Sequence, residues 1–230
     1  MIHALFFDFN GVIIDDERIH LQAYRQVLAD EAIELADEEY FACLGMDDLA
    51  FTRAAFARAG RDVDDQTART LIDREHEKHR SLITQNLPLA PGIVDFTRAA
   101  AHEFQLGIVS MAERSEIDFV LALAGLTDSF SVIVSAEPAL KHKPAPDCYQ
   151  RALTLLNEKR HSQGQALLRP AECLVIEDAP PGIEAARTAG MHTLAVTNTV
   201  GESLLRASGA EVVTGSLADW NADAVHLLYD

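Results

Sequence analysis

The stretch Ala4-Leu5-Phe6-Phe7-Asp8-Phe9-Asn10-Gly11-Val12-Ile13 decides the fold of this 230-residue chain. Its apolar run, rich in Phe and Leu, predicts a buried strand that stops at a lone carboxylate followed by Asn-Gly. A charged side chain at the carboxyl end of a buried parallel strand lies where open α/β sheets bind their ligands. An ordinary Asx turn would leave the same residues after a strand. The later segments of the chain therefore decide between the two interpretations.

From residue 91 onward the chain alternates between helical and strand patterns. Strands are expected at 106–110, 132–134, 173–176, 193–196 and 212–213, and helices at 91–102, 113–124, after Pro146 and at 181–189. Strands separated by helices of this length predict a parallel sheet with right-handed crossovers. The polar segment 158–170 is expected to be an irregular surface excursion.

The segment between the first strand and residue 86 has helical periodicity and no convincing strand. Helices are expected near 17–29, 37–43, 47–59 and 65–84. Such a run of helices inside an α/β chain indicates an inserted module. We therefore predict an α/β fold with a Rossmann-like, doubly wound parallel sheet in a core domain (residues 1–15 and 88–230) and an inserted helical cap domain (residues 16–87).

Composition and charge limit the partners. The chain is 48% hydrophobic and 24% charged, with a net charge of −17 and a pI of about 4.8. Nucleic acid and anionic membranes are not expected as partners, because both require basic patches. Cys43, Cys148 and Cys173 include no CxxC pair and are expected to be reduced, packed thiols. With no signal-peptide pattern at Met1, we expect a cytoplasmic protein that is a monomer or small homo-oligomer.

Polar side chains follow four of the predicted strands. Asp8 and Asn10 follow the first, Ser110 the second and Lys143 the third, and the fourth ends at Glu177-Asp178. All these strand ends face the same edge of a doubly wound sheet, so the side chains can converge. Three carboxylates alone would repel one another, and a hard cation such as Mg²⁺ relieves that repulsion. Lysine supplies a positive charge for a phosphoryl oxygen. Taken singly, each residue is better explained as a helix cap or a surface charge, whereas together, in this order and at matching strand ends, they favour a site.

The motifs together resemble a known family. They are Asp8-Phe9-Asn10-Gly11-Val12, Ser110, Lys143-Pro144-Ala145-Pro146-Asp147 and Glu177-Asp178-Ala179-Pro180-Pro181-Gly182-Ile183-Glu184-Ala185-Ala186, followed by Gly190-Met191. They resemble the four motifs of the haloacid dehalogenase-like (HAD) superfamily, and specifically its phosphoglycolate phosphatase and β-phosphoglucomutase branch. The resemblance covers nearly the whole chain, including the helical insert, which resembles the mobile cap of this branch.

The resemblance implies a role for each motif residue. Asp8 would be the nucleophile that takes a phosphoryl group as an aspartyl-phosphate. Mg²⁺ would be held by Asp8, the backbone carbonyl of Asn10 and Asp178, with Glu177 close by. Lys143 would offset charge on the transferring group, and the cap would close over a small phosphorylated substrate. The residues expected to contact that substrate are Gly11, Ser110, Met111, Lys143, His20 and Gly45.

One position departs from the family pattern. Asn10 stands where the family has an Asp that protonates the leaving oxygen and then deprotonates the attacking water, and an amide does neither. Loss of a general acid–base costs about 10²–10⁴ in rate. Several explanations stay open. The chain is a slow phosphatase or uses substrates with good leaving groups, or His20 supplies the proton. Otherwise it is a weak or inactive phospholigand-binding relative, Asn10-Gly11 deamidates to Asp, or the chain is a trapped Asp-to-Asn variant of an active phosphatase.

Two other chemistries of the family, dehalogenation and phosphonate cleavage, fit the sequence less well. Dehalogenation in this family uses no metal, which would leave Glu177-Asp178 without a purpose. Phosphonate cleavage would need a cap lysine, and Lys78 lies in the polar run 74–80, which we interpret as a solvated helix face. Asp47-Asp48 follow the cap glycine where related mutases have a basic residue, so we predict that bisphosphates are repelled. The alternative is that these cap acids point into solvent.

Overall fold

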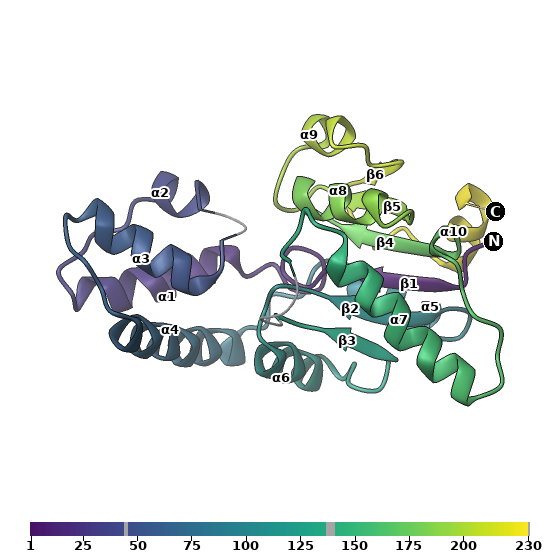
Figure 1. Ribbon diagram of the computed structural model, residues 1–230, viewed down its shortest axis with the longest axis horizontal. Helices are drawn as coiled ribbons and strands as arrows, with labels where there is room; N and C mark the ends of the chain where they lie inside the picture. Colours follow the sequence, from purple (N-terminus) through teal and green to yellow (C-terminus); the bar gives the residue numbers. More distant parts are fainter. Residues whose placement is uncertain (44–45, 137–140, 230) are drawn as a thin grey trace. The chain divides into compact units, whose positions relative to one another are not determined.

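The computed structural model describes residues 1–43, 46–136 and 141–229. The chain divides into two compact units. The first, the core unit, comprises residues 1–15 and 89–230, and the second, the helical unit, comprises residues 16–88. Figure 1 traces the helices and strands of both units in sequence colours.

The core unit is built on a six-stranded sheet in the order β3-β2-β1-β4-β5-β6, in which every pair is parallel. Its strands are β1 (Ala4–Phe7), β2 (Gln105–Val109), β3 (Val132–Val134), β4 (Cys173–Glu177), β5 (His192–Val196) and β6 (Val212–Thr214). This is the Rossmann-like order, which reverses between β1 and β4. The predicted fold class is confirmed, and the reversal point is the edge at which such sheets bind ligands.

The central strand β1 is apolar throughout because both of its faces are covered. Phe6 belongs to a core cluster that includes Tyr149 and Ala185 from helices α7 (Asp147–Ser162) and α8 (Pro180–Thr188). Phe7 faces the opposite layer, where its ring centroid lies 6.0 Å from that of Phe96 in α5 (Ile93–Ala100). Strands buried on both faces form continuous hydrophobic runs, and this pattern made the first strand visible in the sequence.

The core elements differ from the expectations in two ways. Helix α7 continues to Ser162, so residues 158–162 are helical rather than irregular. The polar residues that suggested a loop include Lys159, Arg160 and His161 in the last helical turn, where cations suit the helix dipole. Two short C-terminal helices, α9 (Glu202–Ala207) and α10 (Ala222–Tyr229), were not predicted. The remaining elements are α6 (Arg114–Ala124) and the 3₁₀ turn η1 (Pro170–Glu172).

The helical unit contains α1 (Glu17–Ala29), α2 (Asp37–Phe41), α3 (Asp48–Arg58) and α4 (Asp65–Gln85). Its core includes Tyr24, Tyr40 and Phe51, whose rings pack within 6.4 Å of one another. The three cysteines, one of them in this core, are free and buried, as expected.

Acidic side chains of the helical unit have structural partners. Asp47 caps α3 by accepting from the backbone N–H of Ala50, and Asp48 accepts from the Tyr24 hydroxyl at 2.7 Å. Both acids therefore have hydrogen-bond partners within the helical unit. These contacts support neither of the two interpretations, an acidic opening to the substrate site or acids that point freely into solvent. The cap glycine Gly45 lies outside the described residues.

The polar run at 74–80 is not a uniformly solvated face. Glu75 and His79 are 0% and 1% exposed. They lie four residues apart and therefore share one side of α4, which packs extensively against α1. The prediction of a solvated face is wrong for these two residues, because charge alone does not reveal which side of a helix meets its neighbour.

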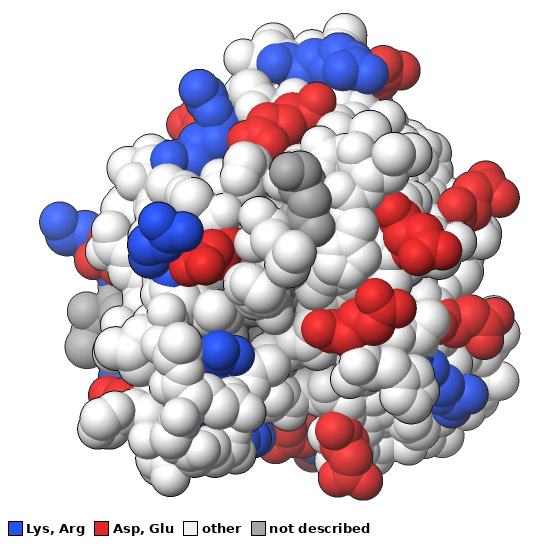
Figure 2. Space-filling model, turned by 90° about the vertical axis from the view of Figure 1, so that its right-hand side faces the viewer, with Lys and Arg blue, Asp and Glu red and all other residues white. Residues whose placement is uncertain are grey.

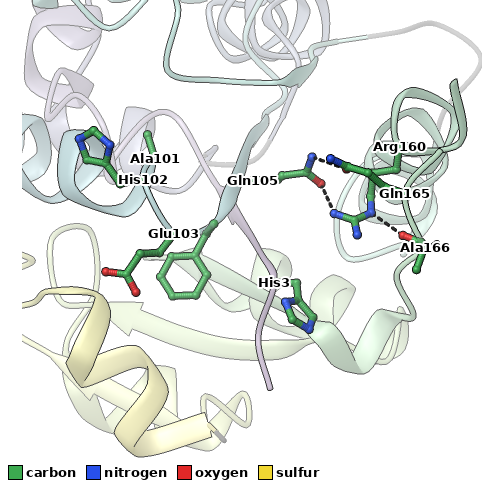
Figure 3. A pocket seen from close by; sticks show the side chains of 9 residues that line it. His3, Ala101, His102, Glu103, Gln105, Arg160, Gln165 and Ala166 are labelled. Atoms are coloured by element: carbon green, nitrogen blue, oxygen red, sulfur yellow. Dashed lines mark hydrogen bonds between the residues drawn. The ribbon is translucent and has the colours of Figure 1, made fainter. Parts of the chain in front are cut away.

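The surface away from the carboxyl ends of the strands carries charges of both signs and a shallow depression. On the face shown in Figure 2, Lys and Arg side chains lie among Asp and Glu side chains. A depression of about 570 Å³ is lined by His3, Gln105, Arg160 and their neighbours (Figure 3). Because His3 precedes β1 and Gln105 begins β2, this depression lies at the amino ends of the strands, opposite the carboxylates. No helix in the described part of the chain is long and apolar enough to cross a bilayer.

Candidate active site

Three carboxylates meet at the edge where the strand order reverses. The register pairs Phe7 of β1 with Ile176 of β4, so Asp8 and Glu177 follow side by side. The backbone N–H of Asp8 donates to the Ile176 carbonyl at 2.9 Å. Carboxylate oxygens of Asp8, Glu177 and Asp178 all lie within 4.8 Å of one another. The parallel sheet thus places acids from distant segments in one cluster.

Lys143 joins the cluster. Its Nζ lies 2.7 Å from Asp8 Oδ1, 2.6 Å from Glu177 Oε1 and 3.0 Å from the Val109 carbonyl. An ammonium group has three N–H donors, so these contacts use all of them and fix the group above the ends of β1, β2 and β4. The peptide bond between Lys143 and Pro144 is cis.

The electrostatics of the cluster favour an additional positive charge. Burial raises the pKa of Asp8 to about 7, and Glu177 adds to the rise while Lys143 opposes it. Burial, with repulsion from Glu177 and Asp8, holds the pKa of Asp178 well above its ordinary value. Burial alone would lower the pKa of Lys143, but attraction to Asp8 and Glu177 raises it well above normal. One ammonium group does not balance three crowded carboxylates.

Two glycines leave room for these acids. Gly11 has φ +78°, and a Cβ there would lie 1.8 Å from Asp178 Oδ2. A Cβ at Gly182 would lie 1.7 Å from Glu177 Oε1. Asp178 Oδ2 is buried and has no hydrogen-bond partner among the described residues. An oxygen-rich cluster with excess negative charge and a buried, unpaired oxygen fits a hard divalent cation.

The other residues singled out in the sequence lie in several places. Ser110 follows β2 and is 2% exposed, and its Oγ accepts from the Ala112 N–H at 3.0 Å. Met111 is half-buried against the core cluster on the α7 side of the sheet. Asn10 is half-buried in the turn that Gly11 completes. His20 belongs to the helical unit, where its Nδ1 lies 3.0 Å from Glu75 Oε1.

Comparison with known proteins identifies the family. The family model described as haloacid dehalogenase-like hydrolase matches residues 5–196, which include the strand ends that carry the cluster. The chain belongs to the haloacid dehalogenase-like hydrolases. Fructose-1-phosphate phosphatase YqaB of Escherichia coli is 29% identical over 193 residues, covering 84% of this chain and 95% of that protein. Beta-phosphoglucomutase of Bacillus subtilis is 26% identical over 230 residues, covering 97% and 93%.

Solved structures share the fold. Beta-phosphoglucomutase from Clostridium difficile superimposes with a TM-score of 0.82 at 22% identity, covering 100% of this chain and 97% of that one. An Asp-to-Asn mutant of CbbY from Rhodobacter sphaeroides, in complex with xylulose-(1,5)bisphosphate, has a TM-score of 0.79 at 22% identity, covering 95% and 96%. These structures show that the chain has the Rossmann-like HAD fold, and the family model makes it an enzyme of the hydrolase family.

Sequence reasoning missed contributors to this haloacid dehalogenase-like site. The Tyr149 hydroxyl donates to Glu177 Oε1 at 2.9 Å, and its ring centroid lies 5.2 Å from Lys143 Nζ. Asn198 Nδ2 donates to the Gly11 carbonyl at 2.6 Å. Thr199 opposes the rise in the pKa of Asp178. The only available signal for Tyr149 was its place three residues after Pro146, on the first turn of a helix that packs on the sheet.

Replacing Gly182 by Ala is expected to lower the free energy of unfolding by about 1–3 kcal/mol, the usual cost of overpacking a filled site. The new methyl group would displace the Glu177 carboxylate, which is held by Lys143 and Tyr149. Urea unfolding measures the loss. Gly215→Ala is the control, because a Cβ there meets nothing within 4 Å. Equal stability of the two variants would contradict the close packing of this motif.

Replacing Tyr149 by Phe is expected to cost about 1–3 kcal/mol of stability, because it removes a donor to a buried carboxylate. Turnover should fall as well, since Glu177 and Lys143 lose a contact that fixes their position. Tyr229→Phe removes a comparable hydroxyl, which donates to the Thr193 carbonyl at 2.9 Å away from the cluster. That control should lose stability but keep its kcat. A kcat that is unchanged in Tyr149→Phe would show that Tyr149 does not position the site.

Proposed function

We propose that this chain is a Mg²⁺-dependent phosphatase that hydrolyses a small phosphorylated metabolite through an aspartyl-phosphate on Asp8. The observation that carries the proposal is the position of Lys143, whose ammonium group bridges Asp8 and Glu177 at the reversal point of the sheet. The names of the relatives add support, because YqaB is a phosphatase and the Bacillus subtilis protein is a phosphomutase. Both names denote enzymes that transfer or remove phosphoryl groups.

The donor set fits the metal. Asp8, Asp178 and the backbone carbonyl of Asn10 would hold Mg²⁺, with Glu177 nearby, since Mg²⁺ prefers carboxylate oxygens and keeps some of its waters. Bound there, it would neutralise charge on the phosphoryl group and on the crowded acids. Asp178 Oδ2, buried and lacking a hydrogen-bond partner among the described residues, is the oxygen best suited to this role.

The chain's own residues account for the transfer. An Asp8 oxygen attacks phosphorus, and the P–O bond to the alcohol breaks with its electron pair on the leaving oxygen. Because Asn10 supplies no proton, the leaving oxygen takes one from solvent, and the attacking water of the second step returns one to solvent. Lys143 exchanges its contact with Asp8 for one with a phosphoryl oxygen, and its contacts with Glu177 and the Val109 carbonyl keep it in place. Ser110, at the end of β2, offers a further polar group. Water then attacks the aspartyl-phosphate, releasing inorganic phosphate and regenerating Asp8.

The alternative is a relative that binds phospholigands with weak or no catalysis. Asn10 favours it, because an amide neither protonates the leaving oxygen nor deprotonates water. An Asp-to-Asn mutant of CbbY has been solved with xylulose-(1,5)bisphosphate, so such a replacement is compatible with ligand binding in a protein of this fold. A trapped variant of an active phosphatase would have the same properties. The helical unit would serve as the cap in either alternative, with His20 and Gly45 as candidate substrate contacts.

A turnover assay tests the proposed function. Phosphate release is measured from sugar monophosphates, including fructose 1-phosphate, from xylulose 1,5-bisphosphate and from an activated aryl phosphate. The proposal expects release from at least the activated ester, and bisphosphates are expected to be poor substrates. Phosphate release from no ester, together with tight binding of one of them, would favour the binding alternative.

Removal of divalent cations is expected to abolish phosphate release, and added Mg²⁺ should restore it. The physical reason is that three crowded carboxylates, offset by only one ammonium group, would otherwise repel an anionic ester. The measurement is the rate after chelation with EDTA and after titration with Mg²⁺. The Asp178→Asn variant should need a much higher Mg²⁺ concentration, whereas Asp128→Asn, an exposed acid, should behave as the unaltered chain. Full activity in excess EDTA would contradict the metal assignment.

A further inference from the structure

A second cluster of metal-ligating side chains lies within the helical unit. Asp16 immediately precedes α1, His20 lies on α1, and His79 lies on α4. The side chains of Asp16 and His79 are 0% and 1% exposed, and that of His20 is 14% exposed. Buried carboxylates and imidazoles that face each other are either a hydrogen-bonded network or a site for a cation.

The geometry brings the ligand atoms to one point. Nε2 of His79 lies 2.9 Å from Asp16 Oδ2, and Nε2 of His20 lies 3.5 Å from the same oxygen. The two imidazole rings are stacked, with centroids 3.8 Å apart and planes inclined by 8°. The ligand atoms of Asp16, His20 and His79 all lie within 4.8 Å of one another. For all three atoms to coordinate one ion, the stacked rings would have to tilt so that their planes meet at the ion.

A second carboxylate, that of Glu75, contacts the ring nitrogen of His20 that does not face Asp16. Glu75 Oε1 lies 3.0 Å from His20 Nδ1, and a carboxylate in this place is the usual partner of a metal-bound imidazole. Because a carboxylate only accepts, the contact keeps a proton on Nδ1 and leaves Nε2 as the coordinating atom. Glu75 is 0% exposed, and its Oε2 has no hydrogen-bond partner among the described residues, although His76 Nε2 lies 3.9 Å away. A buried, half-satisfied carboxylate is costly unless positive charge lies close by.

The buried negative charges of the helical unit also favour a bound cation. With both rings neutral, Asp16 and Glu75 leave two negative charges buried in the helical unit. One divalent cation would neutralise both.

We propose that Asp16, His20 and His79 form a binding site for a borderline divalent transition-metal ion, for which Zn²⁺ is the probe. Imidazole nitrogen with one carboxylate oxygen suits Zn²⁺ and its neighbours, whereas Mg²⁺ prefers an all-oxygen set. Three protein ligands leave a further position for water. The ion would join the start of α1 to α4 and so stabilise the helical unit. The site shares no residue with the carboxylate cluster of the core unit and differs from it in ligand chemistry. A zinc-bound His20 would not be available as a substrate contact.

Zinc titration tests the site. Untagged protein is stripped with a chelator, held in excess Mg²⁺ to occupy the core cluster, and titrated with Zn²⁺ against a chromophoric chelator. The unaltered chain is expected to bind one equivalent, which His20→Gln and His79→Gln should each lose. Glu75→Gln should weaken binding by about 10–100-fold, as removal of an outer partner of a ligating histidine does. Asp178→Asn in the core unit and His161→Gln, an exposed histidine on α7, should retain the zinc.

Two measurements on the unaltered chain test the site without relying on any variant. Zn²⁺ should raise the melting temperature of the unaltered chain, because an ion that binds only the folded state stabilises it. Co²⁺ in the same protein should give visible absorption typical of nitrogen and oxygen ligands. Absence of zinc binding and of a thermal shift in the unaltered chain would overturn the proposal. Zinc retained by a folded His20→Gln/His79→Gln double variant, or lost only in Asp178→Asn, would also overturn it.

Discussion

Replacing Asn10 by Asp is expected to raise the rate of phosphate-ester hydrolysis by about 10²–10⁴-fold, the usual contribution of a general acid–base. The half-buried side chain of Asn10 lies two residues after Asp8, beside the turn at Gly11. A carboxyl group there could protonate the leaving oxygen and then accept a proton from water. The gain should be largest for esters with poor leaving groups, which need protonation most. Steady-state kcat on an alkyl and an aryl phosphate measures both effects.

A matched control for this change is Asn221→Asp. Asn221 accepts from the Ala224 N–H at the start of α10, a role that Asp fills equally well. Its rates should equal those of the unaltered chain. If Asn10→Asp produced no gain on the alkyl ester, the missing proton would have to come from another group, and the role assigned to this position would be wrong. Peptide masses across residues 4–18 also check that Asn10 has not deamidated in the reference protein.

Replacing Asp8 by Asn in the Asn10→Asp chain is expected to reduce phosphate release by about 10⁴-fold or more, as loss of a nucleophile does. The amide keeps the size of the side chain but is not a nucleophile. The fold should survive, because the change removes a crowded carboxylate whose pKa is already raised to about 7 by burial and by Glu177. Rates and urea unfolding are measured together, with the exposed Asp128→Asn as control. Release that persists at the parent rate would exclude Asp8 as the nucleophile.

The core of the site was predictable because parallel strands bring their carboxyl ends to one edge. A run of buried residues before Asp8, and another before Glu177, located both acids without any knowledge of packing. Lys143 follows the third strand by several residues; its place after a strand end suggested that it could converge with Asp8, and the resemblance to a family motif gave it a role. The structure brings these side chains within hydrogen-bond distance.

Contacts that depend on how helices pack could not be predicted. Tyr149 appeared as an ordinary helical residue, yet α7 turns its hydroxyl onto Glu177. Glu75 and His79 belonged to a polar run whose charge suggested solvent, but packing of α4 against α1 buries them. The length of α7 was underestimated because its last turn is made of polar residues that also suit loops. In each instance the local pattern was ambiguous, and tertiary packing decided the outcome.

The most direct test of the account is to look for a phosphoryl group on Asp8. The unaltered protein, with Mg²⁺, is mixed with an activated aryl phosphate, quenched in acid within milliseconds to seconds and analysed by peptide mass spectrometry. Because Asn10 cannot activate the water that hydrolyses the intermediate, we expect the peptide containing Asp8 to carry one phosphoryl group and to retain it longer than in Asn10→Asp. Phosphate release without any modified peptide at any time, or with the group on another residue, would contradict the account.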